Sequence, residues 1–114
     1  MEELQRLRPK VRLEITNPDS EMRSVFGPGI ARLCKGVRER GSLNASAKGM
    51  GMAYSKAWRV IKDTETSLGI RLLDRDGARG STLTEAGDAL LDAYLALDES
   101  VQQAAIDEYN RLVG

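Results

Sequence analysis

Histidine is absent from this 114-residue sequence, and cysteine and aromatic residues are scarce. Without histidine, the chain can form neither a His-based catalytic triad nor an imidazole general base. Its single cysteine, Cys34, cannot close an internal disulfide or complete a zinc site, so we expect no metal and no cofactor. The core has to be mainly aliphatic, with Cys34 as one of its small apolar members. These shortages argue against an enzyme.

Long apolar runs are missing as well. The first ten residues are charged, and no stretch approaches the roughly 18 apolar residues that a membrane span needs. We therefore expect a cytoplasmic protein that makes no membrane contact. The length fits one domain covering 1–114.

The net charge is zero, but the charges are segregated along the chain. Residues 1–83 contain 16 Lys and Arg against 10 Asp and Glu, whereas residues 84–114 contain one Arg against seven acidic residues. A basic body followed by an acidic segment suits a protein that meets phosphates on one face only. Chance clustering in a small domain is the alternative explanation.

The N-terminal third predicts a strand followed by a helix. Val11, Leu13 and Ile15 alternate with polar residues, which is typical of a half-buried strand. The apolar residues of 30–40 then recur with helical spacing. Gly36 weakens the middle of this helix, so we expect a close packing contact there.

Two helices joined by a tight turn come next. Asn44 is the expected N-cap of a short helix over 45–50, which Gly51 ends. A longer helix is predicted for 54–68, with Trp58 and Ile61 facing the core. Of the five residues that follow helical spacing in it, four are apolar; the five are Ala57, Trp58, Ile61, Glu65 and Leu68.

The last third predicts a β-hairpin and a long helix. Short strands at 70–74 and 81–83 flank a turn rich in Gly and Arg, and Thr84 is the expected N-cap of a helix that runs to about Leu112. A heptad-like seam in this helix predicts pairing with a second copy, and it consists of Leu90, Tyr94, Leu97, Val101 and Ala104.

The helices of 44–68 form a helix-turn-helix, a motif whose second helix enters the major groove of DNA. Base and phosphate contacts are expected from the second helix, from Tyr54, Ser55, Lys56, Arg59 and Lys62. Packing at the helix start is an equal alternative for Tyr54, and a solvated surface position is favoured over base reading for Lys62. Asn44 and Ser46 are expected to hold a backbone phosphate. Arg75 and Arg79 would act from the hairpin, the wing.

The stretch from Phe26 to about Tyr94 resembles the N-terminal DNA-binding domain of the molybdate-responsive (ModE-type) regulators, relatives of the LysR-type winged helices. The resemblance is carried by Phe-Gly-Pro-Gly at 26–29, Gly-Ser-Leu at 41–43, Gly-Met-Ala-Tyr-Ser-Lys-Ala-Trp at 51–58, Leu-Gly at 68–69, Leu-Leu at 72–73 and Leu-Thr-Glu-Ala-Gly at 83–87. It implies dimerisation through the terminal helices and operator binding by paired recognition helices and wings.

The chain departs from the family pattern in three ways. Ala53 stands where the family usually has Ser, so the 54–68 helix lacks its expected N-cap, a loss of about 1 kcal/mol. The wing is shorter and has fewer glycines than the family's usual run. The family's molybdate-binding domains have no counterpart in the 114 residues, so molybdate binding is not expected.

These observations predict a winged helix-turn-helix domain with an N-terminal strand and a long C-terminal dimerisation helix. The helix-turn-helix and wing would occupy 24–83, and the long helix 84–113. The predicted function is a transcriptional regulator that binds a two-fold-related DNA operator as a homodimer through the helix at 54–68 and the wing at 75–80. The alternative is a winged-helix module that binds protein instead of DNA.

Overall fold

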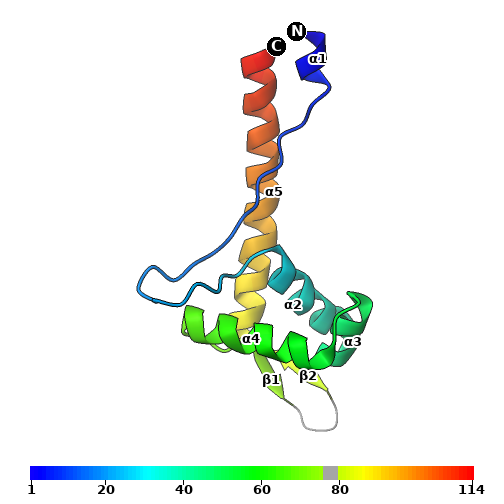
Figure 1. The fold of residues 1–114 in the computed structure, drawn as a ribbon, viewed down its shortest axis with the longest axis vertical. Helices are drawn as coiled ribbons and strands as arrows, with labels where there is room; N and C mark the ends of the chain where they lie inside the picture. Colours follow the sequence, from blue (N-terminus) through cyan, green and yellow to red (C-terminus); the bar gives the residue numbers. More distant parts are fainter. Residues whose placement is uncertain (76–79) are drawn as a thin grey trace.

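A small body of helices and one hairpin carries a single long helix that projects from it (Figure 1). The computed structural model describes residues 1–75 and 80–114. The elements, in chain order, are α1 (Glu2–Gln5), α2 (Pro28–Arg40), α3 (Leu43–Gly49), α4 (Tyr54–Leu68), β1 (Leu73–Arg75), β2 (Ser81–Leu83) and α5 (Glu85–Val113). The molecule measures 57 × 32 × 22 Å, because the second half of α5 extends beyond the body with only the N-terminal segment beside it.

The mainly helical fold with a small sheet is confirmed, and α4 has the predicted bounds. β1 and β2 pair antiparallel, with Leu73 opposite Leu83 and Arg75 opposite Ser81. The first strand of the hairpin therefore begins three residues later than predicted. Glu65 explains the delay, because its carboxylate accepts hydrogen bonds from the backbone N–H groups of Leu72 and Leu73.

Local capping signals set the limits of α2 and α3. Pro28 occupies the first turn of α2, where its missing N–H costs nothing, and Gly41 ends the helix in the left-handed conformation with φ 81°. The prediction that Asn44 caps α3 is wrong. The cap is Ser42, whose Oγ accepts a hydrogen bond from the Ala45 N–H at 3.0 Å. Ser42 has the extended backbone of a cap residue, whereas Asn44 already lies inside the helix.

The core lies where α2, α3, α4, the hairpin and the start of α5 meet. Its largest fully buried apolar side chains are aliphatic except for one phenylalanine; they are Phe26, Leu33, Leu43, Ile61, Leu72, Leu73, Leu91 and Val37. Cys34 is buried among them, as predicted. Burial raises the pKa of its thiol to about 12; the charge of Glu65 adds to this rise and Arg38 opposes it.

The close contact predicted at Gly36 joins α2 to α3. A Cβ atom on Gly36 would lie 2.1 Å from Ser46 Oγ and 2.7 Å from Ser46 Cβ. Ser46 is buried, and its hydroxyl donates a 2.7 Å hydrogen bond to the Leu33 carbonyl. The two helices can therefore approach closely only because position 36 carries no side chain.

The N-terminal strand predicted for 11–15 is not formed. A single antiparallel bridge joins Ile15 to Phe26, through two backbone hydrogen bonds of 2.9 Å. The preceding residues run along α5 (Figure 1), and a helix offers side chains rather than a strand edge as partners. Gln102 accordingly bonds both the N–H and the carbonyl of Val11, while the Tyr94 hydroxyl donates to the Leu13 carbonyl at 2.9 Å.

The start of α5 is fixed against the chain that leads into β1. Thr84 caps the helix as predicted: its hydroxyl accepts from the Gly87 N–H at 2.9 Å and donates to the Arg71 carbonyl at 2.6 Å. A Cβ atom on Gly87 would lie only 2.4 Å from the Leu72 carbonyl oxygen. The long helix and the hairpin are consequently one packed unit.

The contact at Gly36 gives a direct test of this packing. Gly36→Ala should lower the free energy of unfolding by about 1–3 kcal/mol, because the new methyl group overlaps Ser46. Gly29→Ala is the matched control in the first turn of the same helix, where nothing lies within 4 Å of the added Cβ. It should leave stability equal or raise it by up to about 1 kcal/mol. Urea denaturation measures both, and equal stability of the two variants would contradict the predicted overlap.

Candidate nucleic-acid interface

The turn between α3 and α4 sets the direction of α4. Gly51 adopts the left-handed conformation with φ 66°, and the Met52 N–H donates to the Ala47 carbonyl at 2.9 Å. α4 then crosses the front of the body in the view of Figure 1, with the hairpin projecting beside it. α3 and α4 thus form the predicted helix-turn-helix, with α4 at the surface.

The two faces of α4 differ in chemistry. Ala57, Ile61 and Thr64 are buried against the body. The residues predicted to contact DNA from this helix are all exposed, and they are Tyr54, Ser55, Lys56, Arg59 and Lys62. Among the described residues, none of the three cations in this set takes part in an ion pair. The outer face therefore presents cations that form no ion pair with any described residue.

Trp58 is less buried than predicted. Its indole packs against the core but is half-exposed, and its Nε1–H donates a hydrogen bond to the Tyr54 hydroxyl. The two rings meet edge to face, with centroids 6.4 Å apart. Tyr54 is consequently packed at the start of α4, and its side chain is still 43% exposed. Its contact with DNA stays a prediction.

The first residues of α3 are only partly available to a partner. Asn44 is exposed in the first turn, as a phosphate contact would require. Ser46 is 3% exposed, its hydroxyl donates to the Leu33 carbonyl, and its backbone N–H donates to the Ser42 carbonyl at 3.1 Å, so its predicted phosphate contact is wrong. The helical period places Ser46 on the side that faces Gly36.

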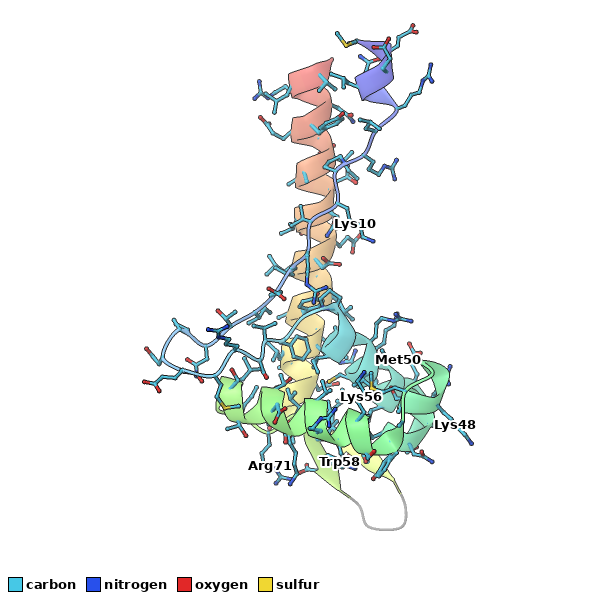
Figure 2. All side chains as sticks on the ribbon, viewed as in Figure 1. Lys10, Lys48, Met50, Lys56, Trp58 and Arg71 are labelled. Carbon is cyan, nitrogen blue, oxygen red and sulfur yellow. The ribbon has the colours of Figure 1, made fainter. Side chains whose placement is uncertain are left out.

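The two wing arginines fall wholly or partly outside the described residues. Arg79 lies outside the described residues, and so does the side chain of Arg75, although the backbone of Arg75 ends β1. Their contacts with DNA remain predictions. Figure 2 shows two cations that the structure does place near the helix-turn-helix and hairpin: Lys56 on α4, and Arg71 on the chain that leads into β1.

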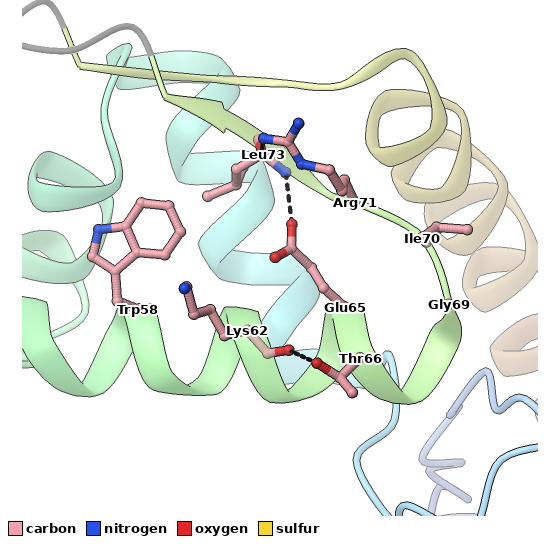
Figure 3. A pocket seen from close by; sticks show the side chains of 8 residues that line it. All are labelled: Trp58, Lys62, Glu65, Thr66, Gly69, Ile70, Arg71 and Leu73. Atoms are coloured by element: carbon pink, nitrogen blue, oxygen red, sulfur yellow. Dashed lines mark hydrogen bonds between the residues drawn. The ribbon is translucent and has the colours of Figure 1, made fainter.

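A cleft of about 510 Å³ separates α4 from the chain that leads into β1; we call it the helix–hairpin cleft (Figure 3). Its walls combine one aromatic ring, two cations and one carboxylate with small and apolar groups; the lining residues are Trp58, Lys62, Glu65, Thr66, Gly69, Ile70, Arg71 and Leu73. Glu65 accepts hydrogen bonds from the N–H groups of Leu72 at 2.7 Å and Leu73 at 3.3 Å. These hydrogen bonds connect the two walls of the cleft.

Sequence reasoning missed the roles of Glu65 and Arg71. Glu65 did leave a signal, because it was the one polar residue among five on the inward face of α4. Arg71 left none, because its place at the cleft depends on how the hairpin packs against the helix. Arg71 bonds the Leu73 carbonyl at 3.2 Å and pairs with Asp74 at 3.3 Å.

One member of the predicted dimer seam belongs to the core of its own chain. Tyr94 is 3% exposed, and its ring meets Phe26 edge to face with centroids 5.3 Å apart, so its predicted role in the interface is wrong. The other seam residues stay at the surface: Leu97 is 45% exposed, Ala104 is exposed, and Leu90 and Val101 are half-buried. An apolar stripe on α5 therefore remains, without the tyrosine.

Acidic residues of α5 are partly neutralised by the basic body. Arg38 on α2 pairs with Asp88 at 2.6 Å and Asp92 at 2.9 Å, and the hydrogen bond to Asp88 is the main cause of the raised pKa of Arg38.

No cluster of three or more metal-ligating side chains occurs among the described residues. In the same part of the chain, no helix combines the length and the apolarity that crossing a bilayer requires.

Comparison with known proteins places this arrangement in a family. The family model described as "Bacterial regulatory helix-turn-helix protein, lysR family" matches residues 31–88, about half of the chain. The "Transcriptional regulator ModE" of Yersinia pestis is 32% identical over 91 residues, which cover 76% of this chain and 34% of that protein. The chain thus spans about a third of the length of this curated relative.

Solved structures are similar over the same region. The protein in the "CbnR_DBD-DNA complex" superposes with a TM-score of 0.60 at 27% identity, covering 74% of this chain and 94% of that one. The protein in the "BenM_DBD/benA site 1 DNA Complex" has a TM-score of 0.57 at 27% identity, with 74% and 92% covered. CbnR, "a LysR family transcriptional regulator", has a TM-score of 0.54 at 30% identity, with 65% and 25% covered.

The uncapped start of α4 yields a stability test. Ala53 has the extended backbone of an N-cap residue, with φ −65° and ψ 142°, but no side-chain acceptor. Ala53→Ser should raise the free energy of unfolding by about 1 kcal/mol, because its hydroxyl can accept a hydrogen bond from the first turn. Ala96→Ser, the same change at an exposed site inside α5, should lower stability slightly. Thermal denaturation compares the two variants, and a shared loss would contradict the capping argument.

Proposed function

Because this chain belongs to the lysR family of bacterial regulatory helix-turn-helix proteins, we propose that it regulates transcription by binding a two-fold-related DNA operator with the outer face of α4. The observation that carries the proposal is the exposed, unneutralised set of polar and cationic side chains on the second helix of the helix-turn-helix. Acting on chromosomal DNA would place the protein in the cytoplasm, with the nucleoid.

The residues at the start of α4 are suited to reading bases. A major groove about 12 Å wide admits one α-helix, and the N-terminal residues of a recognition helix lie closest to the base edges. Arg59 can form a bidentate contact with guanine, and Ser55 can donate or accept a hydrogen bond. Lys56 and Asn44 are exposed, and both can contact the phosphate backbone.

The similarity to the ModE regulator supports a narrower assignment within the family. The Tyr-Ser-Lys-Ala-Trp run at 54–58 spans the start of α4, the segment on which the proposed base contacts depend. We place the chain among ModE-like DNA-binding domains on this run and on the 32% identity. Molybdate recognition is not part of the proposal.

A second copy of the chain is the proposed partner for α5. Leu90, Val101 and Leu112 are spaced by eleven residues, about three helical turns, so they share one face of the helix. Leu97 and Ala104 lie beside them, whereas the N-terminal segment covers the adjacent flank of α5 through Gln102, Tyr94 and Tyr109. Pairing two such faces about a two-fold axis would remove the stripe from water.

DNA binding is tested with a randomised duplex library, followed by anisotropy titration of the selected operator. Arg59→Ala should weaken binding by about 1–3 kcal/mol and relax the base preference at one position of each half-site. Lys56→Ala should weaken binding to all duplexes and reduce the salt dependence.

Lys10→Ala is the matched control, because Lys10 lies on the N-terminal segment beside α5, far from α4 (Figure 2). It should bind as the wild type does. If the wild type selected no duplex, or if both α4 variants bound like the control, the DNA-binding proposal would be wrong. The alternative function as a protein-binding module would then stand.

The dimer is tested by charge insertion on opposite sides of α5. Leu97→Glu should convert the dimer to a monomer in light scattering, because it would bury two carboxylates against an apolar face. Leu95→Glu is the matched control: this residue is similarly exposed, at 37%, but lies about half a turn round the helix. Retention of the dimer by Leu97→Glu would remove the stripe from the interface. Circular dichroism checks that both variants keep their helix content.

A further inference from the structure

The helix–hairpin cleft lies between α4 and the base of the hairpin, the two elements that a winged helix-turn-helix directs at DNA. α4 forms one wall, and the chain that leads into β1 forms the other (Figure 3). Each groove of a duplex is bounded by the two sugar–phosphate strands. An element in the major groove and another at the adjacent minor groove are therefore always separated by one of these strands. The cleft opens between α4 and the base of the hairpin, where such a strand would pass.

We infer that this cleft receives the sugar–phosphate strand that divides the two grooves, with Lys62 and Arg71 contacting its phosphates. The inference rests on the proposed function and adds to it a backbone contact distinct from the base-reading residues. It gives Arg71 a role that sequence patterns did not suggest. It also assigns Lys62 to phosphate rather than to bases.

The chemistry of the cleft matches a polyanion strand. Lys62 is exposed, and 71% of the Arg71 side chain is accessible. The Glu65 carboxylate, the one acidic group of the lining, is bonded to two backbone amides, which orient it toward the hairpin chain. The half-exposed ring of Trp58 lines the same space and offers an apolar surface to a deoxyribose. Two accessible cations beside an apolar wall suit the alternation of phosphate and sugar.

Asp74 competes with DNA for Arg71. The Arg71–Asp74 pair has an N–O distance of 3.3 Å, and half of the Asp74 side chain is exposed. Exposed pairs of this kind are weakly held, so a phosphate can replace the carboxylate. The guanidinium also donates to the Leu73 carbonyl, which keeps it at the cleft when Asp74 is displaced.

Salt dependence tests the phosphate contacts. The affinity for the selected operator is measured between 50 and 200 mM salt for the wild type, Lys62→Gln, Arg71→Gln and the control Lys10→Gln. Each cleft variant should lower the slope of log K against log salt by about 0.9, so that its affinity loss over this range is about 3.5-fold smaller. The order of preference among operator variants should not change, in contrast to Arg59→Ala. The control should match the wild type.

Neutralising Asp74 distinguishes a phosphate contact of Arg71 from a merely structural role, because only a phosphate contact would make operator affinity rise when Asp74 loses its charge. Asp74→Asn should tighten operator binding about 1.4- to 5-fold, the range that corresponds to an exposed ion pair. In the Arg71→Gln background this gain should disappear. Glu99→Gln, the same charge change at an exposed site on α5, should have no effect.

The outcomes separate this inference from the proposed function. Wild-type protein that binds operator, with unchanged slopes in both cleft variants, overturns the cleft contact alone. An equal gain from Asp74→Asn with and without Arg71 overturns the competition between Asp74 and phosphate. A wild type that binds no duplex overturns the proposed function and the cleft contact together.

Discussion

The carboxylate of Glu65 connects α4 to the hairpin, and the geometry of the candidate interface depends on this connection. Two backbone amides with no strand partner are satisfied by one side chain of the helix. Hydrogen bonds to a charged acceptor are about twice as strong as neutral ones, and leaving the amides unsatisfied would cost about 1–3 kcal/mol each. The angle between helix and hairpin is therefore fixed by chemistry as well as by packing.

Close backbone approaches hold the remaining elements to this frame. α3 packs closely on α2 because Ser46 occupies the place that a side chain at Gly36 would take. α5 packs closely on the chain before β1 because the Leu72 backbone occupies the place that a side chain at Gly87 would take. Both contacts depend on the absence of a side chain. A DNA-reading helix gains from such rigidity, because base contacts require side chains that are already in place when the groove is met.

Local signals in the sequence were enough to predict most of the fold. The bounds of α4 and the extent of α5 follow from glycine and threonine caps and from helical periodicity, which depend on neighbouring residues alone. The errors concern partners distant in sequence. Ser46 has the chemistry of a phosphate ligand, but Gly36 makes room for it inside the body. Tyr94 follows the seam spacing, but it lies at the level where α5 still crosses the core.

The N-terminal segment is a further case in which the sequence pattern did not reveal a partner distant in sequence. Alternation at 11–15 correctly placed Leu13 and Ile15 toward apolar surroundings, but alternation cannot tell whether a strand or a helix lies alongside. The structure supplies a helix, so side chains of Gln102 and Tyr94 replace a ladder of backbone hydrogen bonds.

The N-terminal segment, which covers one flank of α5, also affects how many copies of the chain can assemble through that helix. In a bundle of three or more helices around a common axis, each helix must contact two neighbours and so needs a wide apolar surface. Here Val11 and Leu13 occupy one flank, and Tyr109 bonds the Leu4 carbonyl farther along. The narrow stripe that remains can serve a single neighbour. A chain that covers one flank of its own helix in this way would limit any assembly through that helix to pairs.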